Sequence, residues 1–338
     1  MKKIICVLIC ALMAVPLISC GRIQGAQKYS QTAFDLFDTV VTVTAYDESQ
    51  AAFDGHFNEF TALLEEYDKA YDIYNSYDGL NNLKTVNDNA GIAPVEVDGK
   101  ILDLLNEGKA VYEQSGGRVN ICLGAVLSIW HNYREADANA VPSVQELENA
   151  AQHTAIGLLE LTDTTAYIKD SEASLDVGAI AKGYAAEQAC KYAKENLWSS
   201  AVISVGGNVI AYGAGNGEGW NIAIENPKEN AGDYLHTLGL TEKAVVTSAD
   251  TQRYYYVDGK KYCHIINPET LFPSEYMHSV TVIADSSAEA DALTTMLFNM
   301  SIDDGREYVE GLDGVEAVFV DLDYNEVFTS GFEAYIKR

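Results

Sequence analysis

The order of strand-like and helix-like segments constrains the fold more than any other feature of this sequence. Strand-like runs rich in Val, Ile, Thr and Tyr lie mostly after residue 200, at 39–46, 201–205, 220–224, 243–247, 252–257, 279–284 and 315–320. Helix-like segments lie at 50–70, 100–115, 143–154, 180–195, 288–300 and 303–311, and the stretches 86–94 and 137–142 are typical of loops. Because strands and helices do not alternate regularly, the sequence predicts an α+β fold.

The N-terminal segment has the form of an export signal. Lys2 and Lys3 precede an uncharged apolar run at 4–18, which is shorter than the roughly 20 residues that a membrane-spanning helix needs. The run ends at Leu17-Ile18-Ser19-Cys20-Gly21, a pattern that resembles the bacterial lipobox with Cys20 as the lipidated residue. An uncleaved N-terminal anchor is the alternative.

This reading divides the chain into three parts. We expect a lipoprotein signal peptide at 1–19, the lipidated cysteine and a flexible spacer at 20–32, and one domain at 33–338. The lipid would hold the protein at the cell membrane, facing outside the cytoplasm.

Charge and cysteine content narrow the classes of ligand. The formal net charge of −28 repels nucleic acid, so we expect no nucleic-acid partner. An anionic ligand would need local backbone amides, a lysine or a bridging cation.

The cysteines of the expected domain do not form a recognisable set. Cys122, Cys190 and Cys263 are widely spaced and odd in number, which predicts free thiols rather than a disulfide framework or a zinc site.

Two glycine-containing segments could approach a ligand with their backbone. The segment 175–184 reads as a strand end, a turn of small residues and a helix start, so Lys182 could reach a phosphate and Asp176 could accept hydrogen bonds. A tight helix start with a solvated lysine is an equally good interpretation. Ser204-Val205-Gly206-Gly207-Asn208 is a weaker pattern, because Gly-Gly turns between strands are common.

Two further segments carry groups suited to chemistry. His264 enters an apolar run that ends at Asn267-Pro268, after a strand that closes at Thr247-Ser248, and it is either a catalytic imidazole or a buried, satisfied histidine. Asp291 and Thr295 are spaced i and i+4, so both would lie on one face of a helix. A carboxylate and a hydroxyl suit Mg²⁺, although helix capping would explain the same residues.

Taken together and in order, these segments resemble the ApbE family of FAD:protein FMN transferases. The family motifs D-x-G-x-x-A-K-G-Y, G-G-N, T-S-G-x-x-x-R, H-I-I-D-P and A-D-A-x-x-T all have counterparts here. The M-G-T signature corresponds to Phe37-Asp38-Thr39, and S-G-G-x-x-D/N followed by Trp corresponds to 115–120 and Trp130. The resemblance implies a two-lobed fold with mixed or antiparallel sheets, flanking helices and FAD in the groove between the lobes.

The resemblance also implies roles for individual residues. Mg²⁺ would be bound by Asp291, Thr295 and the backbone carbonyl of Ala179. FAD, the substrate, would contact Phe37, Tyr74, Asn120, Asp176, Lys182 and Ile266. His264 would assist proton transfer, with Asp291 as the second catalytic residue. The partner would be an acceptor flavoprotein subunit of an extracytoplasmic electron-transfer system, modified on a Thr or Ser hydroxyl.

The chain departs from the family pattern at several positions. Phe37 and Asp38 replace Met and Gly, Cys122 replaces Thr, Ala249 and Leu271 replace Gly, and Asn267 replaces Asp. The Asn267 change removes a carboxylate but keeps an acceptor oxygen, so a turn-forming role would survive. Because Asp291, Thr295 and Lys182 are intact, we expect an active enzyme. An FAD pyrophosphatase and a flavin-binding lipoprotein without turnover remain the alternative functions.

Overall fold

The computed structural model describes residues 25–136, 138–215, 217, 219–228, 232 and 234–337. The signal peptide and Cys20 lie outside these residues. The helices are α1 (Gln50–Tyr71), α2 (Leu83–Asp88), α3 (Gly99–Gln114), α4 (Gly124–Glu135), α5 (Val144–Ala151), α6 (Ala181–Asn196), α7 (Ser287–Phe298) and α8 (Ile302–Glu310). The α+β prediction is confirmed.

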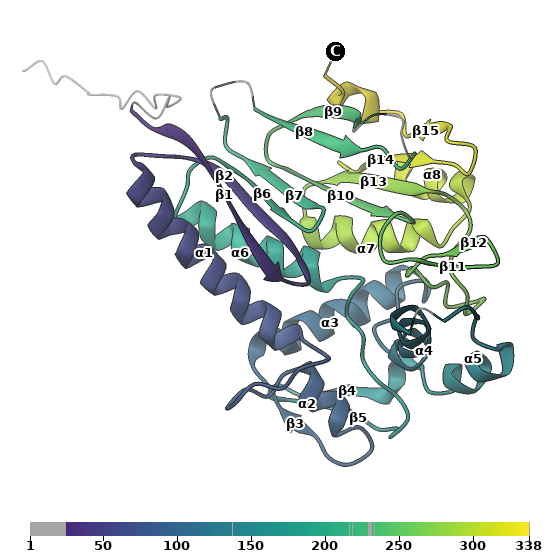
Figure 1. Ribbon diagram of the computed structural model, residues 1–338. Helices are drawn as coiled ribbons and strands as arrows, with labels where there is room; N and C mark the ends of the chain where they lie inside the picture. The colour runs from purple at the N-terminus through teal and green to yellow at the C-terminus, as the bar shows by residue number, and fades with distance from the viewer. Residues whose placement is uncertain are drawn as a thin grey trace, which may run out of the picture.

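The strands are unevenly distributed between two lobes (Figure 1). The sheet lobe contains β1 (Gln27–Leu36), β2 (Thr39–Asp47), β6 (Ala201–Val205), β7 (Asn208–Tyr212), β8 (Trp220–Glu225), β9 (Tyr234–Leu240), β10 (Lys243–Ala249), β11 (Tyr255–Val257), β12 (Lys260–Tyr262), β13 (Ser279–Ala284), β14 (Glu316–Val320) and β15 (Glu326–Phe328). The second lobe contains α2 to α5 and the short strands β3 (Val95–Glu96), β4 (Leu159–Leu161) and β5 (Thr165–Ile168).

The main sheet has eight strands in the order β1-β2-β6-β7-β10-β13-β14-β15, and every neighbouring pair is antiparallel. The strands β6 and β13 have the predicted bounds, whereas the strand predicted at 252–257 is only β11. Residues 27–32 are part of β1, so their assignment to a flexible spacer was wrong. That strand was missed because it is a polar edge strand with most of its side chains exposed.

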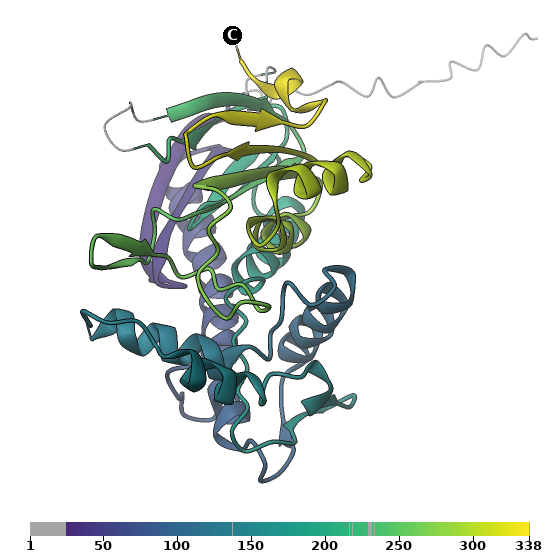
Figure 2. The same ribbon diagram turned by 90° about the vertical axis from the view of Figure 1, so that its right-hand side faces the viewer.

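Both faces of the sheet are covered. Helices α1, α6 and α7 pack on one face, as Figures 1 and 2 show, and the β8–β9 hairpin covers the other through a small core. Side chains of β8 alternate between buried and exposed, the pattern of a strand with one covered face. All six residues of β13 are buried, as expected for a central strand between two layers.

The second lobe joins the sheet lobe through a core centred on Trp130. This side chain of α4 stacks on Tyr262 of β12, with ring centroids 5.9 Å apart, and donates a 2.8 Å hydrogen bond to the carbonyl of Leu271. Helix α4 was not predicted, since its first residue is Gly124 and no side chain caps it. Helix α2, which overlaps the predicted loop at 86–94, is capped by a reciprocal Asn82–Thr85 pair.

Helices α6 and α7 approach each other closely because Gly183 has no side chain. A Cβ atom built on Gly183 would lie 2.3 Å from Cβ of Asp291 and 2.5 Å from the carbonyl oxygen of Ser287. A glycine is therefore required at this helix crossing.

We expect Gly183→Ala to lower the free energy of unfolding by about 1–3 kcal/mol, because the added methyl group must push the two helices apart. Urea unfolding measures this change. Gly55→Ala is the matched control, since Gly55 lies in α1 with open space around its Cβ position. That variant should be stabilised by about 0.5–1 kcal/mol. Equal effects of the two substitutions would contradict the packing argument.

Candidate active site

The close helix pair fixes the carboxylate of Asp291. The N–H of Gly183 donates a 2.7 Å hydrogen bond to Oδ2 of Asp291. Gly183 is the third residue of α6, so its N–H has no acceptor within that helix. The Asp291 carboxylate therefore satisfies one of the free N–H groups in the first turn of α6.

Asp291 is almost fully buried in a polar environment. Burial raises the pKa of its carboxyl group, whereas Lys182, the Gly183 N–H and the Asn208 amide hold that pKa down. Asn208, the last residue of the Gly-Gly-Asn turn, is itself buried, and its Oδ1 has no hydrogen-bond partner among the residues that the structure describes. The sequence did not single out Asn208 as a partner of Asp291, although the Gly-Gly-Asn pattern pointed to this turn.

The donor set around Asp291 suits a hard cation with few protein ligands. It has one carboxylate and, one turn further along α7, the Thr295 hydroxyl. The Ala179 carbonyl is a third ligand only by the family resemblance. Among the described residues, no group of three or more His, Cys, Asp or Glu side chains could hold a metal ion. A site of this composition fits Mg²⁺, which binds through one or two carboxylates plus waters and substrate phosphates.

His264 is held in one tautomer beside this site. Its Nδ1 lies 3.1 Å from the carbonyl oxygen of Gln252. Because a carbonyl only accepts hydrogen bonds, Nδ1 carries the proton and Nε2 keeps its lone pair. Burial, followed in order of effect by Lys182, Arg253 and Arg134, lowers the pKa of His264 to about 3. The imidazole is therefore neutral and able to accept a proton at Nε2.

Three cationic side chains thus converge on His264 in a chain that is strongly acidic overall. They come from α6, the segment before β11, and α4, so both lobes contribute. Asp176 lies in the same electrostatic environment: burial raises its pKa, while the Gly178 N–H, which donates to its Oδ1 at 2.9 Å, and nearby His131, Lys182 and Arg253 oppose that rise. The cluster forms a site for an anionic ligand.

An exposed aromatic pair lies next to this cluster. The rings of Tyr74 and His131 are stacked, with centroids 5.4 Å apart, and 55% of Tyr74 is exposed. Burial of the hydroxyl and the nearby Asp176 raise the pKa of Tyr74. Arg134 bonds to Nδ1 of His131 at 2.8 Å. Sequence reasoning found Tyr74 but missed His131 and Arg134, because α4 carries no capping signal and the family motif in this region extends only to Trp130.

Phe37 lies in the turn between β1 and β2. Its N–H donates a 3.1 Å hydrogen bond to Asp68 of α1, and burial raises the pKa of Asp68 to about 6. The next residue, Asp38, lies 4.0 Å from Arg253. The structure therefore places Asp38, the neighbour of Phe37, near Arg253, and the contact of Phe37 with FAD stays a prediction.

Asn120 and Ile266 have structural contacts. The Asn120 amide donates to the Thr154 carbonyl at 2.9 Å, and its oxygen accepts the N–H of Cys122 at 2.9 Å. The Ile266 side chain is buried in the core around Trp130. Any contact of these two residues with FAD would use their backbone.

The three cysteines that the sequence predicts to be free thiols are free and buried.

The substituted turn after His264 keeps its geometry. Oδ1 of Asn267 accepts the N–H groups of Glu269 at 2.8 Å and Thr270 at 3.4 Å, so the amide replaces a carboxylate as the turn acceptor. Leu271 has a φ of 63°, which explains why a glycine suits that position.

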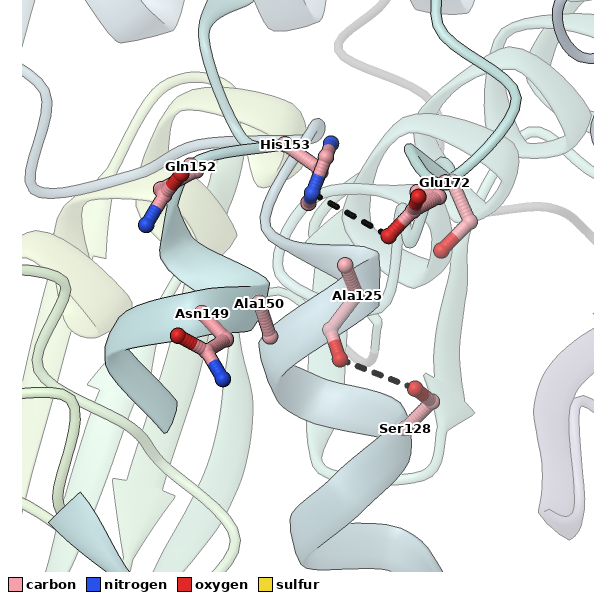
Figure 3. A pocket seen from close by; sticks show the side chains of 8 residues that line it. Ala125, Ser128, Asn149, Ala150, Gln152, His153 and Glu172 are labelled. Atoms are coloured by element: carbon pink, nitrogen blue, oxygen red, sulfur yellow. Dashed lines mark hydrogen bonds and ion pairs between the residues drawn. The ribbon is translucent and has the colours of Figure 1, made fainter. Parts of the chain in front are cut away.

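A cavity of about 540 Å³ lies away from this cluster, between α4, α5 and the segment before Asp176 (Figure 3). None of the predicted site residues lines it. His153 in this cavity is held between Asp170 at 2.7 Å and Glu172 at 3.3 Å. These contacts make His153 an ion-pair partner, and the cavity adds nothing to the active site.

The chain is similar to known proteins over most of its length. The model of the ApbE family matches residues 37–319. The FAD:protein FMN transferase of Treponema pallidum (strain Nichols) is 30% identical over 332 residues, which cover 93% of this chain and 90% of that relative. The FAD:protein FMN transferase of Klebsiella pneumoniae (strain 342) is 28% identical over 250 residues, or 72% of this chain and 76% of that protein.

Solved structures agree with this assignment. The crystal structure of the ApbE protein from Thermotoga maritima has a TM-score of 0.82 and 26% sequence identity, and the match covers 92% of this chain and all of that one. The flavin transferase ApbE from Vibrio cholerae has a TM-score of 0.80 and 24% identity, so it supports the fold.

The low pKa of His264 predicts a pH-dependent contribution to stability. An unfolded histidine has a pKa near 6.5, above the folded value of about 3, so the unfolded chain binds more protons between these limits. Wild-type stability should therefore fall relative to His264→Asn as the pH drops from 7.5 to 4.5. Urea unfolding of both proteins at both pH values measures this difference, and a difference that does not change with pH would contradict the assignment.

Proposed function

Because the chain belongs to the ApbE family, we propose that it is a Mg²⁺-dependent FAD:protein FMN transferase that modifies an exported flavoprotein. The enzyme class and the use of FAD follow from relatives that carry this activity in their names. The dependence on Mg²⁺, the hydroxyl acceptor and the cellular location are our proposals.

One observation carries the chemical part of the proposal. Lys182, Arg134 and Arg253 surround a neutral His264 whose Nε2 is ready to accept a proton. A pyrophosphate is the part of FAD that such a group of cations would bind, since phosphate oxygens form strong charge-assisted hydrogen bonds with Arg and Lys.

The residues present also fit a Mg²⁺ ion. Asp291, Thr295 and the carbonyl of Ala179 would hold it, and the bond from Gly183 orients the carboxylate. Bound Mg²⁺ would neutralise negative charge on the pyrophosphate oxygens.

The proposed reaction is a displacement at phosphorus. The oxygen of an acceptor Thr or Ser hydroxyl bonds to the FMN phosphorus, the bond from that phosphorus to the bridging oxygen breaks, and AMP leaves. Nε2 of His264 takes the hydroxyl proton. Binding of the anionic pyrophosphate counters the three cations that lower the His264 pKa, which brings that pKa closer to the range of an effective base.

The proposal is tested by incubating the purified protein with FAD, Mg²⁺ and an exported flavoprotein subunit from the same organism. We expect AMP release together with flavin fluorescence on the acceptor in a denaturing gel. AMP with free FMN alone would indicate a pyrophosphatase, and neither product would indicate a flavin-binding protein.

Asp291→Asn tests the role of the carboxylate. This change keeps an acceptor for the Gly183 N–H but removes the charge, so Mg²⁺-dependent AMP release should fall roughly 100-fold or more. Glu289→Gln is the matched control, because Glu289 is an exposed acid in the first turn of the same helix. If AMP release by Asp291→Asn depended on Mg²⁺ as it does in the wild type, Asp291 would be excluded as a Mg²⁺ ligand.

We further propose that the protein is anchored to the outer face of the cell membrane through a lipid on Cys20. The order of charges, apolar run and lipobox-like residues at the N-terminus supports this anchor. Within the part of the chain that the structure describes, no helix is both long and apolar enough to cross a bilayer. An anchored enzyme would meet acceptor subunits of an extracytoplasmic electron-transfer system.

Cys20→Ala should move the protein from the membrane fraction to the soluble exported fraction without changing AMP release in vitro, because only the lipid site is lost. Immunoblots of fractionated cells measure the distribution. Continued membrane association of the variant would favour an uncleaved N-terminal anchor.

A further inference from the structure

The proposed reaction requires a second protein to reach the phosphorus beside His264, so some surface next to that histidine must contact the acceptor. One candidate starts at Gln252, whose carbonyl holds His264 at 3.1 Å. The chain continues through Arg253 into the β11–β12 hairpin, which projects from the sheet lobe in Figures 1 and 2.

A continuous band of tyrosines and lysines runs from this hairpin along the edge of the sheet lobe. The rings of Tyr254 and Tyr256 lie 5.5 Å apart, and Nζ of Lys261 lies 5.4 Å from the Tyr254 ring centroid. At the other end, Nζ of Lys228 lies 5.0 Å from the Tyr324 ring centroid. We call these five residues the tyrosine–lysine band.

A buried dyad connects the two ends of the band. Oδ2 of Asp250 lies 2.8 Å from Nζ of Lys261 and 2.9 Å from Nδ1 of His278. The His278 ring in turn stacks on Tyr324, with centroids 4.2 Å apart and planes inclined by 16°. These contacts order the side chains before a partner binds, which lowers the entropy cost of binding.

The band has the composition of a protein-binding surface. Tyr254, Tyr256 and Tyr324 are 37%, 53% and 37% exposed. Exposed tyrosines supply large contact areas with two rotatable side-chain bonds, and they are enriched among residues that dominate binding energies. Two of the chain's 22 basic residues, Lys228 and Lys261, lie on the band and a third, Arg253, adjoins it.

We propose that the tyrosine–lysine band binds the segment of the acceptor protein that carries the modified hydroxyl. This inference rests on the proposed transferase function and adds a surface for the protein substrate. The segment lies in extended form across the tyrosine rings, with backbone carbonyl and acidic groups facing Lys228 and Arg253, and it places the hydroxyl beside Nε2 of His264.

The test uses the full-length protein and the acceptor subunit that the wild-type enzyme labels in the assay above. The double variant Tyr254→Ala/Tyr256→Ala should raise KM for the acceptor about tenfold or more. The dissociation constant for FAD alone, measured by flavin fluorescence, and kcat at saturating acceptor should change less than about twofold. A higher KM for the acceptor with unchanged kcat and FAD affinity distinguishes a docking defect from a general loss of the active site.

Tyr192→Ala is the matched control, because Tyr192 is 36% exposed and lies about 15 Å along α6 from Lys182. It should leave KM for the acceptor unchanged. Lys228→Glu should raise the KM for the acceptor, since one attractive charge becomes repulsive. For the same reason, the KM of this variant should increase less with salt concentration than the KM of the wild type.

An unchanged KM in the double variant, or an equal loss of FAD affinity, would overturn the docking proposal while leaving the transferase function in place. Failure of the wild-type enzyme to label any acceptor would instead count against the proposed function itself.

Discussion

The hydrogen bond from the Gly183 N–H to the Asp291 carboxylate is the contact on which the rest of the site depends. It forms because a residue without a Cβ atom lets α6 and α7 approach to a distance that any side chain would prevent. The same bond satisfies an N–H in the first turn of α6 that has no acceptor within the helix, so this N–H and the Asp291 carboxylate are fixed together at the start of that helix. Lys182 is placed beside them, since it precedes Gly183 in the first turn of α6.

The second constraint is electrostatic. A protein with 50 acidic and 22 basic residues cannot attract an anionic substrate through its overall charge. It can do so where cations from distant segments meet, and here they come from α4, α6 and the segment before β11. Because α4 belongs to the second lobe, the packing of Trp130 against Tyr262 and its bond to Leu271 also determine the charge around His264.

The sequence predicted the parts of the molecule that depend on local patterns. The strands β6 and β13 are central and rich in β-branched residues, and α7 begins after the capping residue Ser286, so their positions follow from composition. The edge strand β1 could not be recognised, because its polar side chains resemble a spacer. His131 and Arg134 could not be assigned to the site either, since their proximity to Tyr74 and His264 arises only when the lobes pack together.

The departures from the family pattern fall on the scaffold and spare the chemical groups. Phe37, Asp38 and Leu271 all adopt positive φ angles, at 53°, 51° and 63°, where a left-handed conformation costs a non-glycine residue roughly 1–2 kcal/mol. Strain of this size persists because the flanking contacts are strong, such as the bond of the Phe37 N–H to Asp68 and that of Trp130 to the Leu271 carbonyl. At Asn267, one oxygen is enough to close the turn. Backbone geometry can tolerate these replacements, whereas the carboxylate of Asp291, the charge of Lys182 and the absent side chain of Gly183 have no substitute that preserves the site.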